Sequence, residues 1–131
     1  MSQDHKLRVL IVDDDPSIVK LLRRFAEDLS FSSVGCTSAE DALEFARGED
    51  VRIALIDLHM PGMEGIELMR ALRLVNSDIE VILVTGDSSS QAAEEAWENG
   101  AYECIWKPID FDHLEQTLIH LREHVHRRIM Q

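Results

Sequence analysis

Residues 10–16, LIVDDDP, decide the fold, because an apolar run there passes directly into three consecutive aspartates. Two like charges about 4 Å apart repel each other by roughly 4 kcal/mol at a near-surface effective dielectric of about 20. A folded chain keeps such a cluster only where something compensates the repulsion. One explanation is a solvated turn that caps a helix, and the other is a cation site.

The composition indicates one acidic globular domain. The chain has 131 residues, of which 45% are hydrophobic and 29% charged, and no apolar run approaches the ~20 residues that span a bilayer. No secretory signal precedes the first apolar run, so we expect a cytoplasmic protein. The net charge of -12 argues against direct binding to nucleic acid or to an anionic membrane. Basic protein surfaces and metal cations suit it better.

Five short apolar runs are predicted as strands. Residues 7–12, 52–56 and 80–84 are nearly continuous β-branched and apolar segments, which is typical of strands buried on both faces. Residues 31–37 and 101–106 are more polar and are predicted as edge strands. Cys36 and Cys104 lie in these two edge strands without metal-ligand spacing, so we expect reduced thiols.

Helices are predicted between the strands, because apolar side chains recur there at helical spacing. The first three patterns comprise Ile18, Leu21, Leu22, Phe25 and Leu29, then Ala42, Leu43 and Ala46, then Ile66, Met69 and Leu72. A fourth, alanine-rich helix is expected over about residues 90–99. The expected caps are Asp15 before Pro16, Ser38, and Asp110, and the expected stops are Gly48 and Gly100.

Alternating strands and helices predict an α/β fold with right-handed crossovers. We expect a doubly wound, flavodoxin-like (βα)5 domain whose five-stranded parallel sheet has the order 2-1-3-4-5. The two cysteines then lie at opposite edges, roughly 19 Å apart, which is beyond disulfide reach.

Ligands of such sheets bind outside the carboxyl ends of the strands, at the switch point between the first and third strands. In the predicted sheet Asp13 and Asp14 end the first strand and Asp57 ends the third. Thr85 ends the fourth strand and Lys107 the fifth. An aspartate after a strand is usually only a turn or cap residue, but together these five residues form a candidate site.

The chemistry of these side chains suits Mg²⁺, which binds through one or two carboxylates together with waters and phosphate oxygens. Asp13 and Asp14 are the expected ligands, while Asp15 caps the following helix. Asp57 could bind the same ion and attack a phosphorus as a nucleophile. The Lys107 ammonium would neutralise charge, and a cis peptide bond before Pro108 would direct it inward.

Four motifs in this order, LIVDDDP, LIDLHMPGMEG, VILVTG and KPID, resemble the receiver domain of bacterial two-component response regulators. The resemblance covers about residues 7–122. It implies that Asp57 is the phosphoacceptor and that Asp13 and Asp14 bind Mg²⁺ together with Asp57 and the backbone carbonyl of His59. It also implies that Thr85 is the switch hydroxyl and that Lys107 contacts the phosphate.

The same resemblance implies a partner and a role. A sensor histidine kinase or a histidine phosphotransfer protein in a phosphorelay would supply the phosphoryl group. The domain would catalyse its own phosphorylation and dephosphorylation, so it would be a signalling module and not a metabolic enzyme. Its conformational switch would control an output.

Two features concern the readout of the signal. The resemblance makes Thr85 and Cys104 the switch positions, but family members usually carry an aromatic residue three positions before the lysine, where this chain has Cys104. We therefore expect the readout to rely on movement of the loop at Thr85 and Gly86 in place of the usual coupling between threonine and an aromatic ring. Strand alternation predicts that Tyr102 and Trp106 share the side of the sheet on which Cys104 lies. His59 and Asp87 resemble the positions that tune phosphoryl lifetime, and we hypothesise that His59 sets it.

The last helix, from Asp110 to about Met130, is longer than the sheet requires. We therefore assign residues 1–122 to the receiver domain and 123–131 to a C-terminal extension. Apolar residues spaced three or four apart are equally typical of a core helix and of a coiled-coil connector, through which the domain would form a homodimer or reach an output domain. This seam comprises Phe111, Leu114, Leu118, Leu121 and Val125. The histidines of this helix, His113, His120, His124 and His126, are expected on a solvated face and not at a zinc site.

Three other functions fit the sequence less well. A flavin-binding protein would need a neutral phosphate-binding loop where this chain has three aspartates. A Mg²⁺-dependent phosphohydrolase of the haloacid dehalogenase type would carry a second aspartate at the position of His59. An interaction module that no longer undergoes phosphorylation is disfavoured, because all five expected site residues are present.

Overall fold

Strands and helices alternate along the described part of the chain, residues 6–86 and 90–130 of the computed structural model. The strands are β1 (Arg8–Val12), β2 (Ser32–Cys36), β3 (Ile53–Asp57), β4 (Glu80–Thr85) and β5 (Glu103–Trp106). The helices are α1 (Pro16–Asp28), α2 (Ala39–Gly48), α3 (Gly65–Val75), α4 (Ser90–Glu98) and α5 (Phe111–Ile129). In the described ranges no helix is both long enough and apolar enough to cross a membrane.

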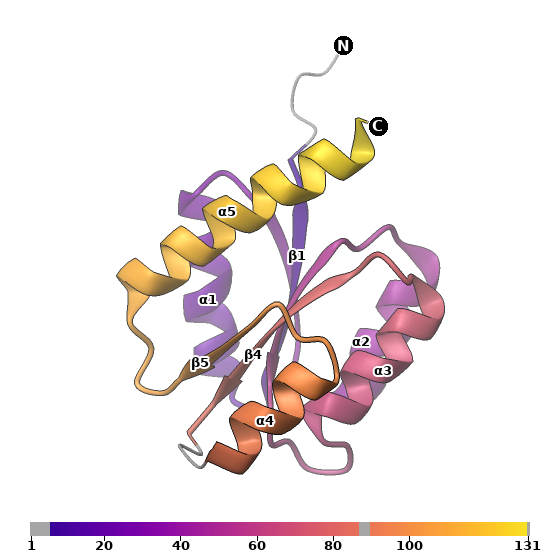
Figure 1. The fold of residues 1–131 in the computed structure, drawn as a ribbon, viewed down its shortest axis with the longest axis vertical. Coiled ribbons are helices and arrows are strands. Elements are labelled where there is room, and N and C mark those ends of the chain that lie inside the picture. The colour runs from indigo at the N-terminus through magenta and orange to yellow at the C-terminus, as the bar shows by residue number, and fades with distance from the viewer. Residues whose placement is uncertain (1–5, 87–89, 131) are drawn as a thin grey trace.

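All neighbouring strands are parallel, and their order is β2-β1-β3-β4-β5, as the sequence predicts. Every residue of β3 is buried, because this strand lies at the centre of the sheet with helices on both of its faces. Figure 1 shows the arrangement of the layers: α1 and α5 cover one face of the sheet, and α2, α3 and α4 cover the other.

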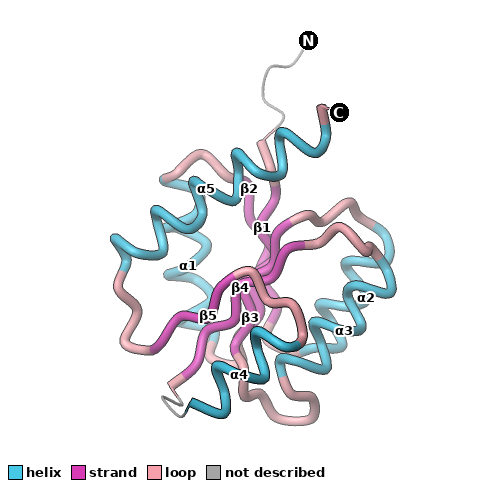
Figure 2. Tube along the Cα trace, viewed as in Figure 1, coloured by secondary structure: helices cyan, strands magenta, loops and turns pink. Residues whose placement is uncertain are grey.

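Two apolar clusters, one on each face, stabilise the sheet. Alternate strand residues such as Val9 and Ile11 pack against α1 and α5, while Leu10 and Val12 pack against the helices on the opposite face. Figure 2 shows the magenta strands enclosed between these cyan helices. Hydrophobic burial on both faces therefore holds the central strands in place, and the residues that end those strands are positioned by a rigid frame.

The helix starts agree with the predicted caps. The carboxylate of Asp15 accepts from the Ser17 backbone N–H, and the Ser38 hydroxyl oxygen accepts from the Asp41 backbone N–H. Asp110 caps α5 in the same way. Each cap satisfies backbone donors that a first helical turn leaves without partners. The third aspartate of the LIVDDDP stretch thus has a local role that is distinct from that of its two neighbours.

The two cysteines are free thiols, and their strands form opposite edges of the sheet, as predicted. Burial raises the pKa of both thiols. The Asp41 carboxylate raises the pKa of Cys36 further, and the Glu103 carboxylate does the same for Cys104. Both groups therefore stay protonated, and the protonated thiol is the unreactive form.

The last turns of α5 contact the body of the domain. Val125 is buried, as are the seam residues Leu114, Leu118 and Leu121, all of them packed against the sheet. Beyond Val125, Arg128 forms ion pairs with Asp78 and Glu80. The core of this domain therefore buries these four seam residues, so they are not available to a coiled coil.

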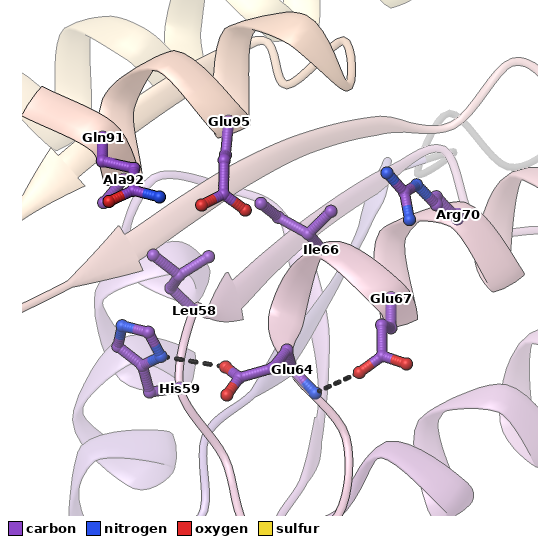
Figure 3. Close-up of a pocket in the computed structure, with 9 residues that line it drawn as sticks. All are labelled: Leu58, His59, Glu64, Ile66, Glu67, Arg70, Gln91, Ala92 and Glu95. Atoms are coloured by element: carbon purple, nitrogen blue, oxygen red, sulfur yellow. Dashed lines mark hydrogen bonds and ion pairs between the residues drawn. The ribbon is translucent and has the colours of Figure 1, made fainter.

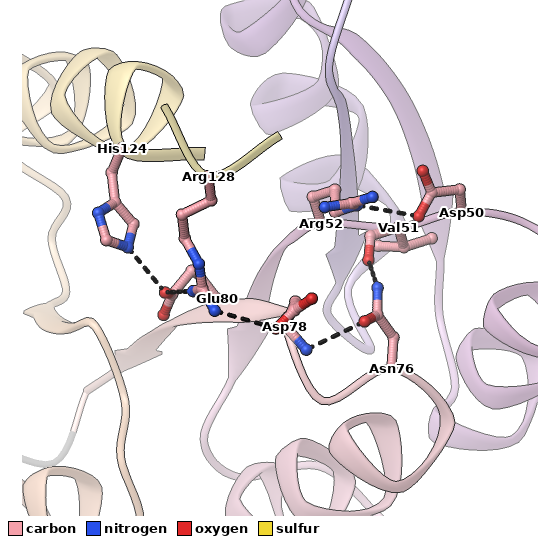
Figure 4. A network of polar contacts seen from close by, with 8 residues as sticks. All are labelled: Asp50, Val51, Arg52, Asn76, Asp78, Glu80, His124 and Arg128. Atoms are coloured by element: carbon pink, nitrogen blue, oxygen red, sulfur yellow. Dashed lines mark hydrogen bonds and ion pairs between the residues drawn. The ribbon is translucent and has the colours of Figure 1, made fainter. Parts of the chain in front are cut away.

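A charged cluster at the start of β4 fastens this part of α5, as Figure 4 shows. The Glu80 carboxylate lies 3.1 Å from His124 Nε2 and 3.1 Å from Arg128 Nη1, while Arg128 Nη2 lies 2.9 Å from Asp78 Oδ1. His113 similarly lies 3.6 Å from the Glu103 carboxylate. The sheet thus supplies acidic partners for His113 and His124, whose side chains stay 51% and 39% exposed.

Candidate functional site

Three carboxylates from two adjacent strands meet at the carboxyl edge of the sheet. Asp13 and Asp14 follow β1 and Asp57 ends β3, and one oxygen from each lies within 4.8 Å of the other two. Asp13 and Asp57 are only 3% and 8% exposed, whereas Asp14 is exposed to solvent. Two of the three negative charges are therefore largely withdrawn from water.

Lys107 supplies a positive charge to this cluster. Its ammonium lies 3.3 Å from Asp13 Oδ2 and 3.7 Å from Asp57 Oδ2. The Lys107 backbone N–H donates to the Thr85 carbonyl at 2.7 Å, which holds the residue beside the end of β4. The peptide bond between Lys107 and Pro108 is cis, as the sequence predicts.

Backbone donors fix two of the carboxylates. The Asp15 N–H donates to Asp13 Oδ1 at 2.9 Å, and the His59 N–H donates to Asp57 Oδ1 at 3.3 Å. Each carboxylate thus keeps its second oxygen for Lys107 and for a ligand. This arrangement pre-orients the oxygens before any ion or substrate arrives.

The pKa of Asp57 is raised above its ordinary value of 3.8. Burial is the largest cause and the Asp13 carboxylate adds to it, while Lys107 and the His59 N–H act in the opposite direction. The charged form of Asp57 is consequently destabilised in the folded protein. A cation bound between these carboxylates would relieve that cost.

The donor set fits a hard divalent cation. It consists of carboxylate oxygens from Asp13, Asp14 and Asp57, and such cations prefer oxygen ligands. Among the described residues this is the one group of three or more acidic, histidine or cysteine side chains close enough to share an ion. The arrangement can therefore hold a metal, with Lys107 as a neighbouring positive charge.

Thr85 ends β4 and is fully buried. Asp57 pairs in register with Val84, so Thr85 lies one residue further along the neighbouring strand. The structure thus places all five predicted residues at one edge of the sheet, although their roles remain predictions. Asp87 lies outside the described residues.

The environment of Cys104 differs from expectation. Cys104 packs against the cluster under α2, α3 and α4, whereas Tyr102 packs on the opposite face, with its ring 6.1 Å from that of His124. The prediction that Tyr102 shares the side of Cys104 was therefore wrong. Strand alternation does not extend to Tyr102 because β5 begins only at Glu103.

Two residues of the MPGMEG motif were given no role by the sequence reasoning, yet they contact the site. Gly65 N donates to the Leu58 carbonyl at 2.7 Å, and Glu64 Oε2 lies 2.9 Å from His59 Nδ1. Glu64 and Glu67, three residues apart at a helix start, are a recognisable capping signal that could have identified this contact. A cavity of about 430 Å³ between α3 and α4 adjoins them (Figure 3).

Comparisons of sequence find relatives among transcriptional regulators. The chain is 32% identical over 126 residues to the transcriptional regulatory protein ZraR of Escherichia coli K12, covering 96% of this chain and 28% of that protein. It is 34% identical over 109 residues to the C4-dicarboxylate transport transcriptional regulatory protein DctD of Rhizobium meliloti, covering 83% and 24% respectively. The chain thus spans about a quarter of the length of these relatives.

Comparisons of structure also find response regulator proteins, and the similar structures are receiver domains. A signal receiver domain of an HD domain-containing protein from Pseudomonas fluorescens Pf-5 superimposes with a TM-score of 0.87 at 25% identity, covering 94% of this chain and 99% of that one. A CheY-like receiver domain protein from Methanospirillum hungatei JF-1 gives a TM-score of 0.83 at 29% identity, covering 93% and 98%. The family model for the response regulator receiver domain matches residues 9–119, and the chain accordingly belongs to the receiver domains of two-component response regulators.

Proposed function

We propose that Asp57 is the residue that accepts the phosphoryl group. The observation that supports it most directly is the position of Asp57: a buried carboxylate at the end of the central strand, 3.7 Å from the Lys107 ammonium and beside Asp13. One Asp57 oxygen attacks the phosphorus of a phosphohistidine, an O–P bond forms, and the N–P bond breaks. The imidazole nitrogen leaves with the electron pair and takes a proton from water.

The ion proposed for this site is Mg²⁺, held by Asp13, Asp14, Asp57 and the backbone carbonyl of His59. When bound, it supplies positive charge to the phosphoryl oxygens. Lys107 adds its own charge, and the Thr85 hydroxyl donates a hydrogen bond to a phosphoryl oxygen. Phosphoryl transfer needs mainly this alignment and charge neutralisation.

Readout of the phosphorylated state is assigned to Thr85 and to Cys104, which lies on the adjacent strand β5 and pairs in register with Leu83. The bound phosphoryl group draws Thr85 toward it and thereby shifts an equilibrium between two conformations of α4 and β5. His59 and Asp87 are proposed to modulate the lifetime of the acyl phosphate. His59 lies beside the phosphoacceptor, since its backbone N–H donates to Asp57 Oδ1.

The proposed phosphodonor is a sensor histidine kinase or a histidine phosphotransfer protein in the cytoplasm. We also propose that residues 123–131 connect the domain to an output domain, because the sequence relatives are transcriptional regulators of which this chain matches only about a quarter. A homodimer through α5 would have to use its exposed side, where His113, Gln116 and His120 lie, since the apolar seam is buried.

Intact-mass spectrometry after incubation with Mg²⁺ and acetyl phosphate tests the phosphoacceptor. The wild-type protein is expected to gain the mass of one phosphoryl group, and Asp57→Asn is expected to gain none. Asp28→Asn serves as the matched control, because Asp28 is an exposed aspartate on α1. Labelling of Asp57→Asn at the wild-type rate would assign the phosphoryl group to another residue.

A further inference from the structure

The first residue of α3 touches the backbone of the phosphoacceptor. A Cβ atom built on Gly65 would lie 2.6 Å from the Asp57 carbonyl oxygen and 2.8 Å from Leu58 Cα, both shorter than real Cβ contacts. To reach an ordinary contact of 3.4 Å, the Asp57 oxygen would have to move by about 0.8 Å. Only a residue without a side chain permits the observed approach.

Moving either the Asp57–Leu58 backbone or the start of α3 would be costly. The atoms that a Cβ would meet are backbone atoms, so no flexible side chain can turn aside. The helix is held by Leu68 and Met69, which are completely buried. Because the core also holds α3, the displacement is shared between the helix and the segment that carries Asp57 and Leu58, which is anchored by the Leu58 N–H donating to the Val84 carbonyl.

The loop between Asp57 and α3 is closed a second time by side chains, as Figure 3 shows. His59 Nδ1 lies 2.9 Å from Glu64 Oε2, and an ionised carboxylate can only accept, so the imidazole donates. The Glu64 backbone N–H in turn donates to Glu67 Oε1 at 3.2 Å. Glu64 thus anchors the residue whose backbone N–H holds Asp57 Oδ1.

We propose that Glu64 and Gly65, at the start of α3, are positioning residues for the phosphoacceptor. Gly65 sets the position of the Asp57 backbone, and Glu64 sets the position of His59 and hence of its carbonyl. This inference rests on the proposed function of Asp57 and of the cation site. Neither residue touches the reacting atoms, and both act through the loop that they close.

Gly65→Ala tests the close approach. A displacement near 1 Å in a reacting group can lower a rate about a hundredfold, so the phosphorylation rate at saturating Mg²⁺ is expected to fall by about ten- to a hundredfold. Mg²⁺ affinity, measured by calorimetry on the unphosphorylated protein, should fall with it. Gly48→Ala is the matched control, because nothing lies within 4 Å of a Cβ at Gly48.

Ile66→Val is the control for an effect of lost stability alone. It shortens a buried side chain of the same helix without adding a Cβ near Asp57. This variant is expected to lower the unfolding midpoint while keeping both the rate and the Mg²⁺ affinity. Equal losses in Ile66→Val and Gly65→Ala would overturn the positioning role of Gly65. Absence of labelling in the wild type would instead refute the proposed function.

Glu64→Ser keeps the test decisive even if Gly65→Ala fails to fold. Serine still suits a helix N-cap but is too short to reach His59. The Mg²⁺ affinity is expected to fall about tenfold, which is the order of loss found when a partner of a metal ligand is removed. Glu44→Ser, which removes an exposed carboxylate from α2, should leave the affinity unchanged. Unchanged affinity in Glu64→Ser, or equal losses in both variants, would overturn the proposal.

Discussion

Gly35, in the edge strand β2, shows how a single residue sets the distance between a helix and the sheet. A Cβ at this position would overlap Val19 Cγ1 and lie 2.9 Å from Arg23 Cδ, both on α1. Arg23 is also fixed by a hydrogen bond from its Nε to the Ser33 hydroxyl oxygen. The absence of a side chain at Gly35 therefore allows α1 to pack directly on β2.

We expect Gly35→Ala to lower the free energy of unfolding by about 1–3 kcal/mol, the usual cost of overpacking a filled site. Urea unfolding followed by circular dichroism would measure it. Gly48→Ala is again the control, because a Cβ there meets open space. A Gly35→Ala variant as stable as the wild type would mean that α1 shifts at no cost.

Asp57 should make stability fall as the pH rises. Its pKa is raised in the folded protein, mainly by burial and then by Asp13, so the folded state binds its proton more tightly than the unfolded state does. The free energy of unfolding then declines as the pH rises from 3.8 through the raised pKa, and the cost is fully present above it.

Asp57→Asn, which carries no charge at any pH, is therefore expected to be more stable than the wild type at neutral pH without Mg²⁺. The difference should shrink as the pH falls toward 3.8. Urea unfolding at several pH values would measure it, with Asp28→Asn as the exposed control. A difference that does not change with pH would show that packing, and not charge, separates Asp57→Asn from the wild type.

The site residues at strand ends could be predicted from the sequence, because an apolar run followed by a polar residue fixes which side chain ends the strand. Asp13, Asp57 and Lys107 were found in this way. The role of Gly65 could not be predicted in this way, because the space around a glycine depends on which backbone the fold places beside it. Tyr102 was misplaced because its predicted strand, residues 101–106, begins two residues later in the structure, at Glu103.

At the scale of elements, α5 is held to the sheet by charge as well as by apolar packing. Glu80 is only 16% exposed at its side chain and faces both His124 and Arg128. Periodicity alone could not reveal this, because the same apolar spacing suits a core helix and a coiled coil. What decides between them is a set of partners on β4 and in the turn before it, about 45 residues away along the chain (Figure 4).

The pairing of Arg128 with Glu80 can be measured by a double-mutant cycle with Arg128→Met and Glu80→Gln. We expect a coupling energy of about 0.5–1 kcal/mol that decreases at high salt, because the arginine is partly exposed. The neighbouring exposed Arg127→Met, combined with Glu80→Gln, is the control and should show no coupling. Zero coupling for Arg128 would mean that apolar packing alone holds the end of α5.

At the scale of the whole molecule, the topology places the site. Parallel strands all present their carboxyl ends at one edge, so residues as distant in sequence as Asp13 and Lys107 meet within 3.3 Å. The doubly wound order was predictable because strand and helix patterns alternate without interruption. The details of loop closure were not, since they depend on contacts made only after the sheet forms.

Mg²⁺ should therefore stabilise the entire domain, since its proposed ligands join β1 to β3 at the centre of the sheet. A ligand at a hundredfold its dissociation constant raises the free energy of unfolding by about 2.7 kcal/mol when it binds only the folded state. Thermal unfolding with and without MgCl₂ would measure the shift, with KCl at equal ionic strength as the salt control.

Asp14→Asn removes an exposed carboxylate that is one of the proposed ligands and has little effect on packing, so this variant should lose most of the Mg²⁺-dependent stabilisation while staying folded. Asp28→Asn lowers the net negative charge by the same amount on α1 and should keep the full shift. Equal shifts in the two variants would indicate that Mg²⁺ acts by screening the net charge of -12 and not by binding at the carboxyl edge of the sheet.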